Sequence, residues 1–324
     1  MRREGSPWRG VSTVFLKELS DHLTGARMLV LEGLVVVTGI VAVYGAIQQV
    51  TDTPVEDRFV FLRLFTQSRE PLPSFVFLIS LLVPLLAIGL GFDLVNGEHN
   101  RRTLSRILSH PIYRDALLFG KFLAGLATIT IGMVALWLLV IGLGIFKLGL
   151  PPSGEEIARS AVLLVVSIVY GGVWLALALL FSIVFRSPAT AALVTLGAWL
   201  FLMILWPLLS PMLADAFSAP QGLNPTDDVL NVLGTRQAIL RLSPNALFLE
   251  IVSIVLDPSM RSTQQSTLAS FGLALLERGA IPGAPLPFLQ SVLIVWGQIV
   301  GLIAGTILLF VAGYVVFQRQ EVRA

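Results

Sequence analysis

The most informative polar residues of an otherwise apolar chain lie in one stretch, residues 97–121, GEHNRRTLSRILSHPIYRDALLFGK. As a helix starting at Glu98, this stretch would have an apolar face and a basic face and would end at Pro111. The apolar face would consist of Leu104, Ile107 and Leu108, and the basic face of Arg102 and Arg106. Such a helix would lie across the cytoplasmic face of the membrane, whereas an ordinary basic loop beside the membrane is the alternative interpretation.

Residues that could break or form bonds are not found in catalytic patterns. The Gly120–Lys121 pair is followed by Phe122 and lacks the earlier glycine of a phosphate-binding loop, so we expect no ATP binding by that route. The chain has no Cys and three His, none of them in a zinc-binding pattern. We expect the three His to be solvated; they are His22, His99 and His110. The sequence therefore predicts no catalytic residue, no metal site and no cofactor bound by this chain, and it assigns no substrate-binding residues.

Two further features lie inside apolar stretches. Glu32 lies about one turn inside the first apolar run, where a charge is costly unless it faces protein, water or the interface. It could reach towards Arg27 at the boundary, or it could take part in substrate binding or coupling. The last apolar run has small residues at every fourth position, which allow close helix packing within one subunit or between subunits. These are Gly297, Gly301 and Gly305.

The elements that hold these residues are membrane helices. Of the 324 residues, 55% are apolar and 13% are charged, about half the charge of a soluble domain, so the chain is an integral membrane protein. The chain has six apolar runs of 18 or more residues, which fit helices of about 20 residues crossing a bilayer. The fold class is therefore all-α and polytopic, with six transmembrane helices. The expected spans are 28–47, 74–92, 122–146, 160–185, 187–214 and 289–317.

Three segments outside these spans have recognisable character. Residues 8–27 form an amphipathic pattern that predicts an interfacial helix before the first span. Residues 97–115 contain the amphipathic helix described above. Residues 215–288, rich in Pro and aliphatic residues, predict short helices lying at the outer surface, with a poorly ordered loop as the alternative.

The distribution of Lys and Arg orients these segments. Basic residues gather in 1–27 and 93–121, which places both termini in the cytoplasm and residues 215–288 outside. The net charge of +2 is spread over several loops without a basic patch, so we expect no nucleic-acid partner.

Residues 97–121 resemble the link between the second and third helices of permeases of type-2 ABC exporters, the ABC-2 family. That link reads approximately E-x-x-x-G-T-L-x-x-L-L-x-x-P-[IV]-x-R, followed by a Gly-Lys pair that opens the third helix. The matching residues are Glu98, Thr103, Leu104, Ile107, Leu108, Pro111, Ile112, Arg114, Gly120 and Lys121. Arg102 stands where the family usually has Gly. Three more segments are similar to the family: 15–29, with the pair Lys17 and Glu18, and 181–194 and 242–258. The order of elements is most like permeases of gliding-motility and nitrous-oxide-reductase maturation transporters.

The resemblance implies a multi-pass permease of the cytoplasmic (inner) membrane, working as a homodimer docked on separate ABC ATPase subunits. ATP and Mg²⁺ would bind to the ATPase, and this chain would not itself be an enzyme. The implied coupling residues are Glu98, Arg101, Arg102, Thr103, Leu104, Arg106, Ile107, Leu108, Pro111 and Arg114. An external accessory protein is a further possible partner. The rival hypotheses are a secondary transporter or channel that needs no ATPase, and a membrane scaffold or sensor.

Overall fold

The structure is a computed structural model, and it describes residues 7–52, 59–70, 72–100, 114–217, 225–259 and 285–319. Within these ranges the chain is helical, and the β-structure consists of an isolated bridge between Arg69 and Leu72. The all-α polytopic fold class is therefore confirmed.

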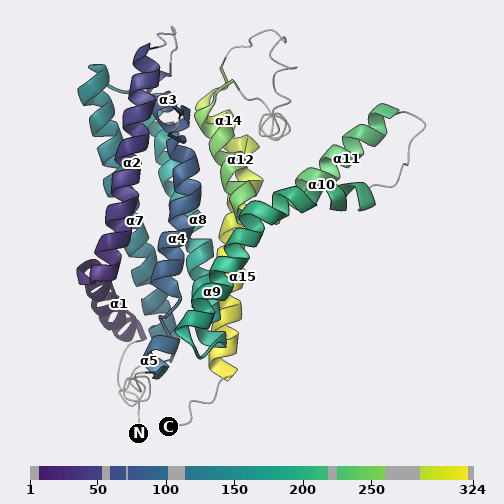
Figure 1. Cartoon of the computed structure of the whole chain (residues 1–324). Helices are drawn as coiled ribbons and strands as arrows, with labels where there is room; N and C mark the ends of the chain where they lie inside the picture. Colours follow the sequence, from purple (N-terminus) through teal and green to yellow (C-terminus); the bar gives the residue numbers. More distant parts are fainter. Residues whose placement is uncertain are drawn as a thin grey trace.

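Six helices in the described part of the chain are long and apolar enough to cross a membrane. They are Met28–Thr51, Phe75–Glu98, Asp115–Leu148, Gly154–Val184, Pro188–Phe217 and Trp296–Arg319. Their number agrees with the six apolar runs of the sequence. In Figure 1 most of them stand side by side as a bundle, with α1 (Pro7–Thr24) lying across one end.

The bundle is built around α8 (Gly154–Val184), which contacts α4 (Phe75–Gly91), α7 (Arg114–Leu148) and α15 (Trp296–Arg319). Large side chains of α8, including those of Tyr170 and Trp174, are completely buried. Because α8 is covered on several sides, it is the fixed element against which the other helices are placed.

We name the two ends of the bundle by what lies there. The α1 end contains α1, α5 (Asn96–Asn100), the start of α7 and the end of α15; the α3 end contains α3 (Val60–Thr66) and the start of α8 (Figure 1). The helix α2 (Ala26–Asp52) runs from the first to the second. On the orientation expected from the sequence, the α1 end is the cytoplasmic one.

Several predicted span boundaries differ from the helix ends in the structure, and two of these differences have local reasons. The fourth span begins at Gly154 and not at residue 160, because Ser153 and Glu156 cap the helix reciprocally. The last apolar run is two helices, α14 (Phe288–Ile294) and α15, interrupted at Val295.

The region expected to lie at the outer surface does contain short helices, but α12 (Pro244–Leu256) is buried in the bundle. It packs against α8, α15 and α4. Phe248 of α12 stacks on Tyr170 with 4.6 Å between ring centroids, and the Tyr170 hydroxyl lies 3.2 Å from Asn245 Oδ1. The preceding α11 (Pro225–Leu240) meets α12 at an angle of 112°. The chain therefore turns back into the bundle at α12, which corrects the expectation of a segment lying only on the surface.

The fifth span projects from the bundle. It consists of α9 (Pro188–Leu200), a π-helix η1 (Phe201–Leu205) and α10 (Trp206–Phe217), here called the arm. Figure 1 shows the arm leaving the α1 end beside α15 and leaning away towards α11. Only 11% of the most apolar 18-residue stretch of the arm is buried, against 67% of the corresponding stretch of α8. The arm is therefore the span with the least support from its own subunit.

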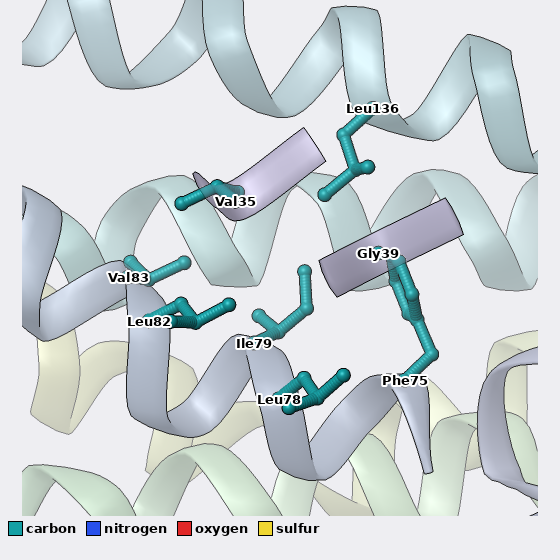
Figure 2. Close-up of a pocket in the computed structure, with 8 residues that line it drawn as sticks. All are labelled: Val35, Gly39, Phe75, Leu78, Ile79, Leu82, Val83 and Leu136. Carbon is teal, nitrogen blue, oxygen red and sulfur yellow. The ribbon is translucent and has the colours of Figure 1, made fainter. Parts of the chain in front are cut away.

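A small apolar cavity lies between α2, α4 and α7 (Figure 2). Its volume is about 10 Å³, close to the minimum for one water molecule. Its lining is Val35, Gly39, Phe75, Leu78, Ile79, Leu82, Val83 and Leu136. A space this small and apolar is a packing defect and does not form a path for a substrate.

Candidate functional site

A buried cation joins three helices at the α1 end of the bundle. Lys121, near the start of α7, has 2% of its side chain exposed. Its Nζ donates to Oε1 of Glu18 on α1 at 2.9 Å and to Oε1 of Glu98 on α5 at 2.8 Å. We call Glu18, Glu98 and Lys121 the inner triad. A buried charge is tolerated when it is paired and hydrogen-bonded, and here one ammonium serves two carboxylates.

The glycine that precedes the lysine lets α1 come close enough for this contact. A Cβ atom built on Gly120 would lie 2.7 Å from Cγ1 of Val14 and 3.2 Å from the backbone N of Phe15. A side chain at position 120 would therefore push α1 away from α7. The Gly-Lys pair has a physical role here: the first residue makes room for α1, and the second holds it.

The charges around Glu18 fix its ionisation. Burial alone would raise the pKa of the Glu18 carboxyl, but the neighbouring Lys121 and Lys17 outweigh burial and hold this pKa below its ordinary value of 4.5. Lys17 is 58% exposed and lies 2.8 Å from Oε1 of Glu18 and 3.0 Å from Oδ2 of Asp21. Of the two lysines that contact Glu18, the buried Lys121 is therefore the structural partner. The exposed Lys17 adds a contact at the solvent.

The short helix α5 has a second attachment at its beginning. The backbone N–H groups of Val95 and Asn96 donate to Oγ of Ser182 at 3.0 and 3.3 Å, and Nδ2 of Asn96 donates to the carbonyl of Phe185 at 3.2 Å. Ser182 lies in the last turn of α8 and Phe185 caps that helix. Thus α5 is tied to Lys121 of α7 through Glu98, and to the end of α8 through Asn96, while Lys121 in turn holds Glu18 of α1.

Most of the predicted coupling residues follow α5 directly and lie outside the described residues. This group is Arg101, Arg102, Thr103, Leu104, Arg106, Ile107, Leu108 and Pro111. Of the other two, Glu98 belongs to the inner triad, and Arg114 begins α7 with its side chain outside the description. The structure therefore describes the two anchors of this segment, α5 and the start of α7, while its docking role remains a prediction.

The sequence analysis did not select Lys121 and Glu18 as site residues, although both lie in the segments that carry the family resemblance. His22, expected to be solvated, is 7% exposed on the same face of α1 as Val14 and Glu18. That expectation was wrong because the face of α1 that packs on α7 includes polar residues. The available signal was the charge of Lys121 directly before an apolar run and that of Glu18 within the amphipathic segment 8–27.

The intramembrane candidate Glu32 lies on α2. Its Oε1 atom is buried and has no hydrogen-bond partner within the described part of the chain. Val35 and Gly39, three and seven positions further on, line the small cavity in Figure 2. The side chain of Arg27, to which Glu32 could reach, is outside the description. The structure brings no second polar group among the described residues to this carboxylate.

The three spaced glycines of α15 differ in their surroundings. A Cβ on Gly301 would touch Cδ1 of Leu247 on α12 at 3.4 Å, whereas Gly297 and Gly305 have nothing within 4 Å. Of these three glycines, only Gly301 is therefore explained by close packing within the subunit.

A second buried cation stands at the α3 end. Arg159 of α8 is fully buried, and its guanidinium donates to Glu155, to the carbonyls of Val255 and Leu286, and to Oγ of Ser291. These contacts fix the end of α12 and the start of α14 to α8. All are structural contacts, and no group of three potential metal ligands occurs among the described residues.

The sequence is similar to known membrane transport proteins. A family model described as "ABC-2 family transporter protein" matches residues 12–322. "Probable ABC transporter permease protein NosY" of Pseudomonas aeruginosa is 32% identical over 151 residues, which is 44% of this chain and 52% of the relative. The protein of the same name from Stutzerimonas stutzeri is 27% identical over 150 residues. The chain thus spans about half the length of the curated relatives it matches.

Proposed function

The chain belongs to the ABC-2 family of transporter proteins, and from this premise we propose that it is the permease subunit of an ATP-binding cassette exporter. A separate ATPase subunit binds and hydrolyses ATP with Mg²⁺, and the permease contributes the membrane path and no catalytic residue. The family resemblance first carried by residues 97–121 is confirmed by the family match across the chain.

The inner triad is the observation that best supports this proposal. Glu98 on α5 and Lys121 on α7 flank the candidate coupling segment and form an ion pair, and Lys121 also pairs with Glu18 on the interfacial helix α1. A segment anchored at both ends by buried polar contacts moves together with the bundle. Force applied to residues 101–113 by an ATPase would therefore reach α1, α7 and α8 as rigid-body motion, which is how packed helices pass on a displacement.

The same proposal includes a second copy of the chain. Exposed apolar side chains cover the arm and α15, and Gly297 and Gly305 face open space. In a homodimer, part of these surfaces would meet the other subunit and the rest would face lipid. The substrate path in this proposal runs between the subunits.

The proposed location is the cytoplasmic membrane, with both termini and residues 101–113 on the cytoplasmic side and α11 outside. The bias of Lys and Arg supports this orientation. An external accessory protein would find α11 and the loop before α14 on its side of the membrane.

The experiment that tests the function uses the complex of this chain with its ATPase. Changing both Leu104 and Leu108 to Asp would place charges where the coupling helix needs apolar contact, at a cost of several kcal/mol if the contact is buried. We expect the ATPase to be lost from a pull-down, or its turnover to become independent of the permease. The variant should still insert, because the spans and their basic flanks are unchanged.

The matched control changes Ser105 and Ser109 to Asp, which adds the same charge to the same segment away from its apolar face. This variant should bind the ATPase normally. Arg102→Gly, which introduces the residue usual in the family, should also retain binding. If the Leu104 and Leu108 double variant keeps full binding and permease-dependent turnover, residues 97–115 are an ordinary basic loop and the coupling proposal is wrong.

A further inference from the structure

The hydrogen bonds that join the start of α5 to the end of α8 lie directly before the first helix of the arm. A displacement of α5 could therefore reach the arm through them. Ser182 accepts the N–H groups of Val95 and Asn96, and Asn96 holds the carbonyl of Phe185. Ser182 is 1% exposed and Asn96 is 3% exposed, so water does not compete for these hydrogen bonds. The contact is therefore a persistent connection between the beginning of α5 and the turn after α8.

The turn between α8 and α9, which follows Phe185, is very short. Only Arg186 and Ser187 separate Phe185 from α9, and Ser187 caps α9 through the backbone N–H of Thr190. A displacement of the Phe185 carbonyl would therefore be transferred to the first turn of the arm. A longer turn would absorb that displacement in its own backbone.

The arm is the least buried of the six candidate spans in the described part of the chain. It has little contact with its own subunit, and the π-helix η1 interrupts it midway. A π-helical turn widens the backbone and is common at functional sites. By contrast, α4 and α8 are held together where Gly91 meets α8: a Cβ on Gly91 would lie 2.5 Å from Cβ of Ala178. The element before α5 is thus fixed, whereas the arm beyond Phe185 is tied to the rest of the subunit at its middle, where Oγ of Ser243 donates to the carbonyl of Leu202 and Nε1 of Trp206 donates to the carbonyl of Ile239.

From these contacts we propose that Asn96 and Ser182 are positioning residues that pass displacement of the coupling segment to the arm. This inference rests on the proposed function, because it needs an ATPase that moves residues 101–113. The inner triad carries the same displacement to α1 and α7, whereas the Asn96–Ser182 link selects the arm as the span that changes its angle. A merely structural link would stabilise the fold without altering how the arm responds to ATP.

The test measures the arm directly in the permease–ATPase complex. The chain has no Cys, so spin labels can be attached to cysteines introduced at Phe146 on α7 and Leu208 on α10, which are 78% and 66% exposed. Labelled subunits are diluted with Cys-free subunits, so that the distance is measured within one subunit. We expect this distance to change between the nucleotide-free complex and the complex trapped with ATP and vanadate.

In Ser182→Ala and in Asn96→Ala, the nucleotide-dependent change in distance should be lost, while ATP hydrolysis by the complex continues. Ser182→Thr keeps the hydroxyl and should restore the change. The matched control is Ser167→Ala: Ser167 is another buried serine of α8, but its hydroxyl donates to Leu163 within the same helix. It should behave like the unchanged chain.

The two proposals fail in different ways. A full change in distance in both alanine variants would overturn the role of the Asn96–Ser182 link, and so would an unchanged distance in the wild-type complex during normal ATP turnover. Failure of the wild-type chain to bind any ATPase would instead overturn the proposed function. If Ser182→Ala does not fold, Asn96→Ala decides, because it leaves the Ser182 hydroxyl in place.

Discussion

Lys121 and Glu18 lie 103 positions apart in the chain, and the Nζ of the lysine is 2.9 Å from Oε1 of the glutamate. Both side chains are more than 90% buried, at 2% and 8% exposure. This pair joins the helix that lies across the end of the bundle to the third span. Because α5 meets the same ammonium through Glu98, losing the lysine would leave one buried and one partly buried carboxylate without their shared cation.

We therefore expect Lys121→Met to destabilise the folded chain by about 3–5 kcal/mol, the usual cost of removing one partner of a buried ion pair. Thermal unfolding of the detergent-purified protein, followed by circular dichroism, would measure the loss. The matched control is Lys17→Met, at the 58% exposed lysine that contacts the same glutamate. An exposed pair contributes about 0–1 kcal/mol, so this variant should unfold almost like the unchanged chain. Equal losses in the two variants would contradict the structural role of Lys121.

The lowered pKa of Glu18 predicts a dependence of stability on pH. Because the folded-state pKa lies below the ordinary value of 4.5, the ionised carboxylate stabilises the fold. Its contribution is fully present above about pH 4.5 and is lost as the pH falls through the lower folded-state pKa. Unfolding midpoints measured from about pH 7 down to about pH 3 should fall less steeply in Glu18→Gln than in the unchanged chain. Parallel profiles for the two proteins would show that Glu18 carries no such linkage.

The spans could be predicted from the sequence because length and hydropathy alone determine which helices can cross a bilayer. The same criterion failed for α12, whose 13 residues are too few for a span. Its burial depends on Tyr170 and Asn245 meeting across helices, which one sequence does not display. The start of α8 was readable in principle, since Ser153 and Glu156 have the spacing of a capping box.

Only part of the candidate site could be predicted from the sequence, for a similar reason. Glu98 was chosen because it lies in a segment with a family resemblance, whereas Lys121 and Glu18 each look like a charge at a membrane boundary. Lys121 and Glu18 form a site because they meet although more than a hundred residues separate them in the chain. Sequence patterns do not reveal such a contact. The same holds for the break at Val295, where an apolar run continues without Pro or Gly at that position.

Gly120 gives a prediction that separates packing from helix propensity. Alanine is the better helix former by about 1 kcal/mol, but at this position its Cβ would lie 2.7 Å from Val14. Overpacking of this kind costs about 1–3 kcal/mol, so Gly120→Ala should lower the unfolding midpoint and loosen α1. Gly132, in the same helix, has nothing within 4 Å, and Gly132→Ala should be neutral or stabilising. Limited proteolysis of α1 measures the loosening; equal protection of α1 in both variants would be inconsistent with close packing at Gly120.

Arg159 should hold α12 and α14 in place at the other end of the bundle. In Arg159→Met, the carbonyls of Val255 and Leu286 lose their buried donor, and each unsatisfied group costs about 1–3 kcal/mol. The end of α12 should then separate from α8 before the rest of the bundle unfolds, because its contacts with α14 and α8 meet at this guanidinium.

The Cys-free chain allows that opening to be followed at one position. Val255 is 1% exposed and close in size to cysteine, so Val255→Cys should react slowly with a maleimide while Arg159 is present. Adding Arg159→Met should speed the reaction well beyond the effect of Lys147→Met, a change of an exposed cation near the same end of the bundle. Lys147 contacts the ring of Phe146 on the surface, so its loss leaves no buried acceptor unpaired. Slow labelling in the Arg159→Met background would mean that apolar packing of Phe248 against Tyr170 is sufficient to hold α12, and that the guanidinium is dispensable for its placement.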